Sequence, residues 1–301
     1  MTRGMSRGAM RELLHPLGYP VLVASDAPEP LRIAAQSWGP RRPLFDAPPL
    51  RLTIHARPGP LPPAGPSYRA SVDGFSLVCD PATRGQFSIR ALAACLHVSR
   101  PVLDQAEWFR HQLLECLVLT ALDTIHFVGL HAACVVPPKR QEGVLLCGAS
   151  GSGKSTLAYA CARAGWTFIC DDSHLAPGLG NLVTGSSDKI RLREPARDLF
   201  AELRAKPLVT APNGKQCIET GAPAVADAAS ARHCVFLSRR PGAAALRRYP
   251  EKCAVEYFMA YNTRYDRSGA EQRLGEFVRG GTWLLEYEGL DDAIAALEQL
   301  P

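Results

Sequence analysis

Short runs of apolar residues, broken by glycine and proline, dominate the first third of the chain and predict β-strands. One of these runs folds around a turn at Asp73 and Gly74, and residues 31–38 predict a short helix. Proline and glycine cluster over residues 40–66. These features predict a small α+β domain over residues 1–100, in which no motif carries chemistry. The runs expected as strands are residues 20–24, 50–56 and 68–79.

A different pattern starts at Pro101, where apolar residues recur every three or four positions, as they do along the buried face of a long helix. Strand-like and helical segments follow, so we expect an α/β domain over residues 101–301. The expected helix face consists of Leu103, Ala106, Phe109, Leu113, Leu114, Leu117 and Ala121. Strands are expected over residues 129–136, 144–147, 167–170, 189–192, 216–219, 234–237 and 282–287. Helices are expected over residues 155–164, 196–204, 251–262, 271–279 and 290–300.

The composition is that of an ordinary globular protein. Of the 301 residues, 47% are hydrophobic and 21% are charged, and the net charge is +5. A charge this small implies at most a mild preference for anionic partners. The sequence has no lysine-rich run, no zinc-finger spacing and no repeat of aromatic and basic residues. We therefore expect no nucleic-acid partner.

The cysteines and the apolar stretches bear on the location of the protein. The ten cysteines form no CxxC pair, and several, such as Cys134 and Cys170, lie in apolar runs, which is typical of reduced thiols. The first ten residues lack the apolar core of a secretory signal. The longest uncharged apolar stretch, residues 124–138, is shorter than the roughly 20 residues that a membrane span needs. We therefore expect a cytoplasmic protein with no membrane partner.

The most specific motif runs from Gly148 to Thr156 and follows the pattern Gly-x-x-x-x-Gly-Lys-Ser. Glycines permit backbone conformations that turn successive N–H groups around an anion, and a helix starting at Lys154 adds its positive end. In this motif the lysine reaches the terminal phosphates and the Ser155 hydroxyl takes a magnesium ion. The sequence therefore predicts a site for ATP, or another nucleoside triphosphate, with Mg²⁺. The expected binding residues are Gly148, Ala149, Ser150, Gly151, Ser152, Gly153, Lys154, Ser155 and Thr156.

Two adjacent carboxylates, Asp171 and Asp172, lie seventeen and eighteen positions after Lys154. One helix, a glycine stop at Gly165 and one strand separate them from the loop. This path places the acidic pair at the carboxyl end of the strand next to the loop, where sites in open α/β sheets gather. Beside a magnesium triphosphate, one carboxylate can hold the metal while the other accepts a proton from an attacking hydroxyl.

Taken together, these features resemble the catalytic domain of the HPr kinase/phosphorylase family. The resemblance rests on Leu130 and His131 ahead of the strand, the glycine-rich loop, the helix that ends at Gly165, and the Asp171–Asp172 pair. It covers residues 120–175 strongly and the remainder of the chain weakly. It implies a mixed sheet like that of phosphoenolpyruvate carboxykinase, and phosphoryl transfer from a nucleotide to a hydroxyl group.

The resemblance also implies roles for individual residues. Asp172, or its neighbour Asp171, is the proton acceptor, and Ser155 with the other aspartate, expected to be Asp171, holds magnesium. Lys154 grips the phosphates and His131 lines the site. The family forms hexamers, which implies a homo-oligomer.

The chain departs from the family in two places. Residues 180–224 contain nothing like the second family signature, a glycine-containing loop that binds the protein substrate, and the first third does not resemble the family's N-terminal domain. The resemblance therefore extends to divergent relatives of HPr kinase, and it does not imply HPr as the substrate. The acceptor is expected to be a hydroxyl-bearing peptide, protein or small molecule.

Several other polar residues are weaker candidates for the same site. His174 follows the acidic pair by two positions, and Lys189, Arg191 and Arg193 lie on an expected strand, where their charges can stabilise a transferred phosphoryl group. The alternative for this strand is a solvated face. Lys215, beside Asn213 and Gly214, has the same two interpretations. The pairs Arg239–Arg240 and Arg247–Arg248 are expected on the surface.

Three other functional classes share parts of this pattern. An ABC-type ATPase needs a Leu-Ser-Gly-Gly-Gln stretch, which the sequence lacks. A small-molecule kinase of the nucleoside or shikimate type usually has an arginine-rich lid and places its acidic residues differently. The main alternative is a regulatory sensor that binds or hydrolyses the nucleotide without transferring phosphate.

Overall fold

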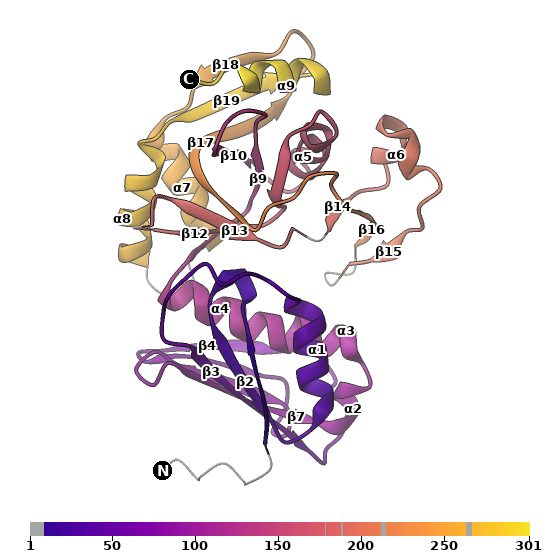
Figure 1. Cartoon of the computed structure of the whole chain (residues 1–301), viewed down its shortest axis with the longest axis vertical. Helices are drawn as coiled ribbons and strands as arrows, with labels where there is room; N and C mark the ends of the chain where they lie inside the picture. The colour runs from indigo at the N-terminus through magenta and orange to yellow at the C-terminus, as the bar shows by residue number, and fades with distance from the viewer. Residues whose placement is uncertain (1–8, 178, 188, 212–214, 263–266) are drawn as a thin grey trace. The chain divides into compact units, whose positions relative to one another are not determined.

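The structure is a computed model that describes residues 9–177, 179–187, 189–211, 215–262 and 267–301. The chain forms two compact units, Met1–Ile125 and His126–Pro301 (Figure 1). The division lies later than the boundary predicted after residue 100. The reason is that the helix expected to open the second domain, which ends in α4 (Cys116–Ile125), packs against strands of the first unit.

The first unit is built on a mixed sheet of seven strands in the order β1-β2-β3-β7-β6-β5-β4. Strands β2, β3 and β7 are parallel to one another, whereas the other pairs are antiparallel. The strands are β1 (Met10–Leu14), β2 (Val21–Ser25), β3 (Leu50–Arg57), β4 (Ser67–Ser71), β5 (Gly74–Val78), β6 (Arg84–Ser88) and β7 (Ala93–Ser99). The helices are η1 (Pro16–Gly18), α1 (Pro28–Trp38), α2 (Arg100–Leu103), α3 (Ala106–Trp108), the π-helical turn η2 (Phe109–Glu115) and α4.

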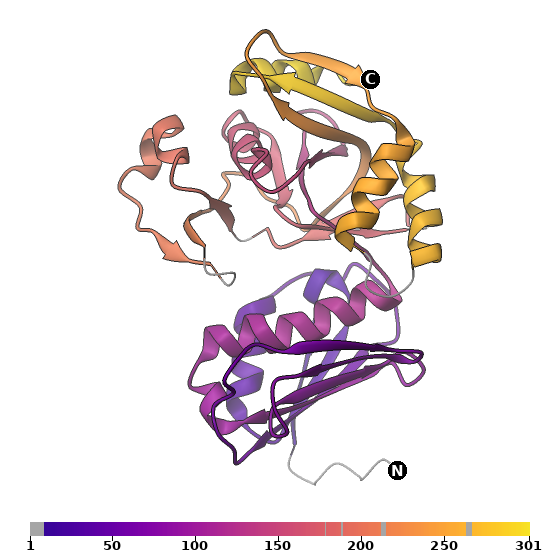
Figure 2. The same ribbon diagram turned by 180° about the vertical axis from the view of Figure 1, so that it is seen from behind.

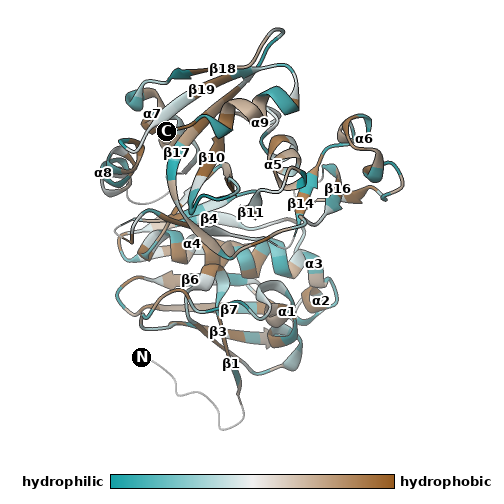
Figure 3. Cartoon of the chain, turned by 45° about the horizontal axis from the view of Figure 1, so that its top comes forward, coloured by the Kyte–Doolittle hydropathy of each residue, from teal (hydrophilic) through white to brown (hydrophobic). Residues whose placement is uncertain are grey.

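Helices α1 and α4 pack on this sheet (Figure 2). Strand β3 shows why: Leu50, Leu52 and Ile54 are fully buried, while the residues between them are exposed or half-buried and largely polar. Figure 3 shows that hydrophilic and hydrophobic residues are mixed along the elements of this unit. Successive side chains of a strand point to opposite faces, so the apolar set forms the core face of the sheet. The alternate set forms an open face that carries polar and charged side chains.

The second unit contains a larger mixed sheet of nine strands. Its main path is β11-β9-β10-β17-β13-β12-β8, and β19 extends the sheet from β17 and pairs with β18. Strands β10, β17 and β19 are parallel, whereas β9 runs antiparallel to both β10 and β11. These strands are β8 (Val128–Leu130), β9 (Ala132–Val136), β10 (Glu142–Cys147), β11 (Thr167–Cys170), β12 (Ser173–Ala176), β13 (Leu182–Gly185), β17 (Ala228–Arg239), β18 (Ala245–Arg248) and β19 (Thr282–Tyr287).

Among the described residues, a small separate sheet and six helical segments complete the second unit. The sheet has the order β14-β16-β15 and consists of β14 (Ile190–Leu192), β15 (Val209–Thr210) and β16 (Gln216–Thr220). The helices are α5 (Lys154–Arg163), α6 (Ala196–Leu199), η3 (Ala201–Leu203), α7 (Glu251–Asn262), α8 (Arg267–Val278) and α9 (Leu290–Glu298). Among the described residues, no helix combines the length and apolar character needed to cross a bilayer.

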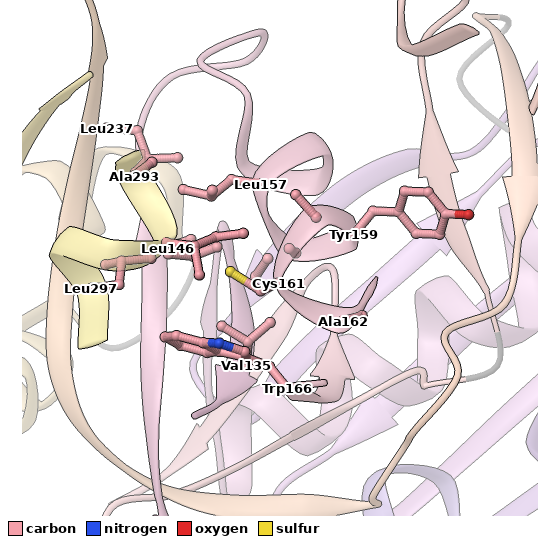
Figure 4. Packing of buried hydrophobic residues seen from close by; sticks show 14 of the residues in the cluster. Val135, Leu146, Leu157, Tyr159, Cys161, Ala162, Trp166, Leu237, Ala293 and Leu297 are labelled. Atoms are coloured by element: carbon pink, nitrogen blue, oxygen red, sulfur yellow. The ribbon is translucent and has the colours of Figure 1, made fainter. Parts of the chain in front are cut away.

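Both faces of the larger sheet are covered, which explains why β10 is apolar and buried from Gly143 to Cys147. Leu146 joins a core that includes Leu157 of α5 and Leu297 of α9 (Figure 4). Leu145 points to the opposite core, which includes Phe258 of α7. Because β10 is held from both faces, its carboxyl end is a fixed point from which the next segment of the chain departs.

The predicted strand over residues 129–136 is two strands in the structure. β8 ends at Leu130 and pairs with β12, whereas β9 starts at Ala132 and pairs with β10 and β11. His131 is the residue between them, so it lies at a break rather than inside a strand. The continuous apolar composition of this segment concealed the break, because both short strands are buried.

All ten cysteines are free thiols, and six of them are buried. Burial raises the pKa of residues such as Cys134 and Cys170, which keeps these thiols protonated. They therefore pack as small apolar side chains, in agreement with the expectation from their position in apolar runs.

Candidate functional site

The glycine-rich loop connects the end of β10 to the start of α5. Gly148, Gly151 and Gly153 all have positive φ angles, of 142°, 89° and 98°. A side chain at Gly148 would come within 2.6 Å of Ser152 Oγ, and one at Gly153 within 2.9 Å of the Tyr287 hydroxyl. The loop thus depends on glycine for both conformation and space. It presents the unpaired backbone N–H groups of the first turn of α5, which suit an anion.

Lys154 is the first residue of α5, and its side chain turns back under the loop. Its Nζ atom donates hydrogen bonds to the carbonyl oxygens of Gly148, at 2.7 Å, and Ala149, at 3.2 Å. The same atom lies 3.1 Å from Nε2 of His131. The residue is only 7% exposed, and burial lowers the pKa of its ammonium group, while Asp172 and Asp171 act in the opposite direction. Lys154 is therefore a buried cation at the centre of the loop.

His131 connects Lys154 to Asp172. Its Nδ1 atom lies 3.2 Å from Oδ1 of Asp172. Because the ammonium group of Lys154 donates to Nε2, the proton of the neutral ring resides on Nδ1, which donates it to the carboxylate. Desolvation raises the pKa of Asp172, but the hydrogen bond with His131 and the positive charge of Lys154 oppose it, and the pKa falls below its ordinary value. The Asp172 side chain is 77% exposed, so it is an ionised carboxylate open to solvent.

Asp171 has the opposite environment. Burial raises the pKa of its carboxyl group to about 6, and the charge of Asp172 adds to the increase, while a hydrogen bond with the Ser155 hydroxyl opposes it. Its Oδ1 atom is buried and has no hydrogen-bond partner among the described residues. A hydroxyl and a carboxylate with an unsatisfied oxygen, side by side at the start of α5, are suitable ligands for Mg²⁺. The two adjacent aspartates therefore differ in exposure and in the direction of their pKa shift.

The topology explains how these residues meet. Strand β9 lies between β10 and β11 and runs in the opposite direction, so the start of β9 meets the ends of its two neighbours at one edge. The loop follows β10, the acidic pair follows β11, and His131 precedes β9. The prediction that the acidic pair lies at the carboxyl end of a strand is confirmed, but this strand is not adjacent to β10. The intervening strand is the one that brings in His131.

Tyr257 of α7 is a site residue that the sequence analysis did not identify. Its hydroxyl oxygen accepts the backbone N–H of Gly148 at 3.0 Å and lies 2.6 Å from the carbonyl oxygen of Gly148 and 3.1 Å from that of His131. It therefore links the start of the loop to the residue before β9. One turn later on α7, the half-exposed ring of Tyr261 lies 5.3 Å from the ring of His131. The only sequence signal was a tyrosine pair at i and i+4 on a helix.

The three cations of the 189–193 segment are divided between two environments. Arg193 reaches the loop, with its Nη2 atom 3.1 Å from Ser150 Oγ. Lys189 and Arg191 instead form ion pairs with Glu219 of β16, at 2.6 and 3.1 Å. Arg193 is thus the member of this group placed beside the glycine-rich loop, whereas the other two stabilise the pairing of β14 with β16.

The remaining candidates lie as follows. His174 is near enough to Asp172 to lower its pKa electrostatically, and its ring meets Phe127 edge-on at 6.2 Å. The backbone carbonyl of Lys215 accepts a hydrogen bond from Ala211, and the adjoining Asn213 and Gly214 lie outside the described residues. Arg240 and Arg247 form ion pairs with Glu286, and Arg248 stacks on Trp283.

Comparisons with known proteins give little information on identity. No protein-family model matches the chain, and no curated protein matches it. Among solved structures, the chain is similar to the HPr(Ser) kinase/phosphatase from Coxiella burnetii, with 14% sequence identity and a TM-score of 0.31. The match covers 56% of this chain and 93% of that protein. A similarity this weak assigns the chain to no family.

Proposed function

We propose that the second unit is a kinase that transfers the γ-phosphoryl group of ATP, or a related nucleoside triphosphate, to a hydroxyl group with the help of Mg²⁺. The observation that carries the proposal is the hydrogen-bonded series Lys154–His131–Asp172, which runs from the glycine-rich loop to an exposed carboxylate. Phosphoryl transfer to a hydroxyl group requires two functions of the protein. One is to bind the phosphates, and the other is to accept a proton.

The loop and α5 are assigned to the nucleotide. The residues Gly148, Ala149, Ser150, Gly151, Ser152, Gly153, Lys154, Ser155 and Thr156 surround the phosphates through backbone N–H groups and two side chains. In the nucleotide complex Lys154 exchanges the carbonyl oxygens of Gly148 and Ala149 for phosphate oxygens. Arg193, which is placed over the loop by its contact with Ser150, adds positive charge where negative charge develops during transfer.

Magnesium is assigned to Ser155 and Asp171. The unpartnered Oδ1 atom of Asp171 and the neighbouring hydroxyl of Ser155 fit such an ion. When bound, the ion neutralises phosphate charge and orients the phosphates for transfer. Burial raises the pKa of Asp171 to about 6, so a bound cation would stabilise the ionised form of this carboxyl group.

Asp172 is assigned as the proton acceptor. It is ionised, it is exposed to an incoming acceptor, and His131 holds one of its oxygens in place. When Lys154 moves to the phosphates, Nε2 of His131 loses its donor, while Nδ1 keeps its hydrogen bond with Asp172. The sequence allows either aspartate as the base, and we propose Asp172 because it is the exposed member of the pair.

The order of motifs along the chain further supports a distant relationship to HPr kinases and to the mixed sheet of phosphoenolpyruvate carboxykinase. We propose a hydroxyl-bearing peptide, protein or small molecule as the acceptor, and a homo-oligomer in the cytoplasm as the working form. HPr itself is not proposed, because residues 180–224 lack the second family signature.

Direct detection of phosphate transfer tests the proposal. The purified chain is incubated with γ-labelled ATP, Mg²⁺ and a panel of serine- and threonine-containing peptides and small alcohols. Incorporation of label into an acceptor supports a kinase. Nucleotide binding, or hydrolysis, that persists without transfer to any member of a broad panel would instead favour a regulatory nucleotide sensor.

A further inference from the structure

The first unit carries a second group of chemically active side chains, on the open face of its sheet. They gather at the carboxyl ends of the parallel strands β2, β3 and β7, the location at which α/β sheets typically bind ligands. None of them was singled out in the sequence, because they come from four separate segments. The group, here called the β3–β7 cluster, consists of Asp26, His55, Arg57, Arg84, Cys95 and His97.

Strand register brings the members of the cluster together. His55 is paired with His97 across β3 and β7, and His97 is paired with Arg84 across β7 and β6. The two imidazole rings stack with their centroids 5.2 Å apart. These three residues therefore form one row across three adjacent strands, on the face opposite the buried core.

Asp26 organises one side of the cluster. Its carboxylate accepts the backbone N–H of Ala56 at 2.9 Å and the Nη1 atom of Arg57 at 2.8 Å, and it lies 3.3 Å from Nδ1 of His55. On the other side, Arg84 contacts the carbonyl oxygen of Pro81 and pairs with no carboxylate in the part of the chain that the structure describes. The cluster thus contains two guanidinium groups but only one carboxylate among the described residues.

The electrostatic effect of this imbalance is seen at His97. Burial lowers the pKa of His97, and the charges of His55, Arg84 and Arg57 lower it further, with only Asp26 acting in the opposite direction. Arg57 and Arg84 act on Cys95 as well, where they oppose the increase of the thiol pKa by burial. The centre of the row is therefore a position of positive potential that a bound anion would relieve.

The cluster also contains hydrogen-bond donors that its contacts among the described residues leave unused. Within the described residues, Arg57 and Arg84 each make hydrogen bonds through Nη1 alone, although a guanidinium group has five N–H donors. The contact of His55 with Asp26 uses one ring nitrogen, and the contact of His97 with Cys95 also uses one. Forked guanidinium donors beside imidazole nitrogens are well suited to an oxyanion with several acceptor oxygens.

From this arrangement we propose that the β3–β7 cluster is a binding site for a phosphomonoester, separate from the nucleotide site of the second unit. A metal ion is a poorer occupant, because no group of three or more potential ligands in the described residues has the geometry to hold one. The shared chemistry is a phosphate dianion on an alcohol oxygen, carried either by a free small molecule or by a phosphorylated side chain of a peptide.

Binding is tested on the full chain with O-phosphoserine and a phosphoserine-containing peptide as probes, and with serine and sodium chloride at matched ionic strength as references. All titrations use the Lys154→Ala background, so that the glycine-rich loop contributes little. Proton NMR follows the imidazole signals of His55 and His97, assigned with single His→Gln variants. The two phosphorylated probes distinguish the sources, because a site for peptides binds the peptide more tightly than the free amino acid.

Three arginine variants locate the binding. We expect Arg84→Gln and Arg57→Gln each to weaken phosphoserine binding about tenfold or more, since each removes charge-assisted hydrogen bonds. Arg51→Gln is the matched control: it lies on the same strand and face as Arg57 but roughly 20 Å away, and its guanidinium donates to the carbonyl of Ala91. It should change binding by less than about twofold. Thermal unfolding checks that each variant folds. If one of the two cluster variants does not fold, the other still tests the proposal.

The expected result is saturable binding of phosphoserine but not serine, with shifted His55 and His97 signals and a rise in the pKa of His97. Equal signal changes with sodium chloride would overturn the proposal. It would also be overturned if folded Arg84→Gln, or folded Arg57→Gln, bound phosphoserine as well as Arg51→Gln does. Neither outcome depends on kinase activity, so the test is independent of the function proposed for the second unit.

Discussion

The Nζ atom of Lys154 lies 3.1 Å from Nε2 of His131, so the lysine of the glycine-rich loop is bonded directly to the histidine that holds Asp172. The same ammonium group also donates hydrogen bonds to two carbonyl oxygens of the loop. A ligand that attracts Lys154 therefore changes the hydrogen bonding of His131 at the same moment. In the proposed function, this one contact couples nucleotide binding to the state of Asp172.

The first prediction concerns the grip on the nucleotide. Lys154→Ala removes the buried ammonium group, and we expect nucleotide affinity to fall about tenfold or more, since a charge-assisted contact with phosphate is lost. Isothermal titration with a non-hydrolysable ATP analogue measures the change. Lys252→Ala is the control, because that side chain is 89% exposed on α7. Unchanged affinity in Lys154→Ala would show that the lysine does not contact the phosphates.

The second prediction concerns Tyr257. Tyr257→Phe leaves the ring but removes the acceptor of the Gly148 N–H and the link to His131, so it should cost about 1–2 kcal/mol of unfolding free energy. It should also raise the KM for nucleotide, because the start of the loop is less well held. Urea unfolding and steady-state kinetics measure the two effects. Tyr261→Phe, which keeps its ring contact with His131, should change neither. Identical behaviour of the two variants would argue against a positioning function for Tyr257.

The third prediction concerns the pH dependence that Asp171 introduces. Its pKa is raised from 3.8 to about 6, so the folded protein holds this proton more tightly than the unfolded chain does. The residue therefore costs stability as pH rises from about 4 to above 6, and that cost is absent when both states are protonated. Asp171→Asn should raise the melting temperature at pH 8, but hardly at pH 4, when neither metal nor nucleotide is present.

Magnesium reverses the sign of this effect. Binding of Mg²⁺ with nucleotide requires the ionised form of Asp171, so affinity should increase as pH rises through 6 in wild type, and this increase should be lost in Asp171→Asn. Thermal unfolding across pH, with and without Mg²⁺ and nucleotide, measures both parts. Asp198→Asn, at an exposed position on α6, is the control. If the difference in melting temperature between Asp171→Asn and wild type stayed the same from pH 4 to pH 8, the buried environment assigned to Asp171 would be contradicted.

The fourth prediction concerns the first unit. Glu115 receives hydrogen bonds from Ser37 of α1, at 2.5 Å, and from Arg110 of η2, at 2.8 Å, and lies 2.7 Å from His111. Burial raises its pKa, but these partners together lower the pKa to about 2. The stabilisation is complete above the ordinary pKa of 4.5 and is lost as pH falls toward 2.

Glu115→Gln should therefore lower the stability of the first unit at pH 7 by about 2 kcal/mol, and the difference from wild type should shrink at pH 3. Denaturant unfolding followed by Trp38 and Trp108 fluorescence measures it. Glu107→Gln, whose side chain is 79% exposed, should have little effect. An equal loss at both pH values would mean that packing, not ionisation, sets the contribution of Glu115.

Parts of the fold that depend on local pattern were predictable from the sequence. The strands at residues 167–170 and 282–287 and the helix at residues 251–262 were predicted with the bounds that the structure has. Strands β6 and β7 were not predicted, because their polar and apolar residues mix on a sheet with one open face. The break at His131 was also missed, since composition does not distinguish one buried strand from two.

The candidate site likewise contains residues that the sequence predicted and residues that it did not. The loop and the acidic pair follow from a motif and a short path along the chain, so sequence spacing was enough to bring Lys154 and Asp172 together. Tyr257 lies 109 positions from Gly148, and only the packing of α7 brings it to the loop. For the same reason, the sequence did not show that Arg193 reaches Ser150 whereas Arg191 pairs with Glu219. Tertiary contacts decided between side chains that look equivalent in sequence.

The most direct test of the account compares Asp172→Asn with wild type in phosphoryl transfer and in nucleotide binding. The substitution keeps the size of the side chain and its contact with His131 but removes the charge that accepts a proton. We predict that nucleotide affinity remains within about threefold of wild type while transfer to the acceptor falls by about 100-fold or more. If Asp172→Asn transferred phosphate at the wild-type rate, Asp172 would not be the base, and if Asp171→Asn did so as well, the proposed kinase centre would be wrong.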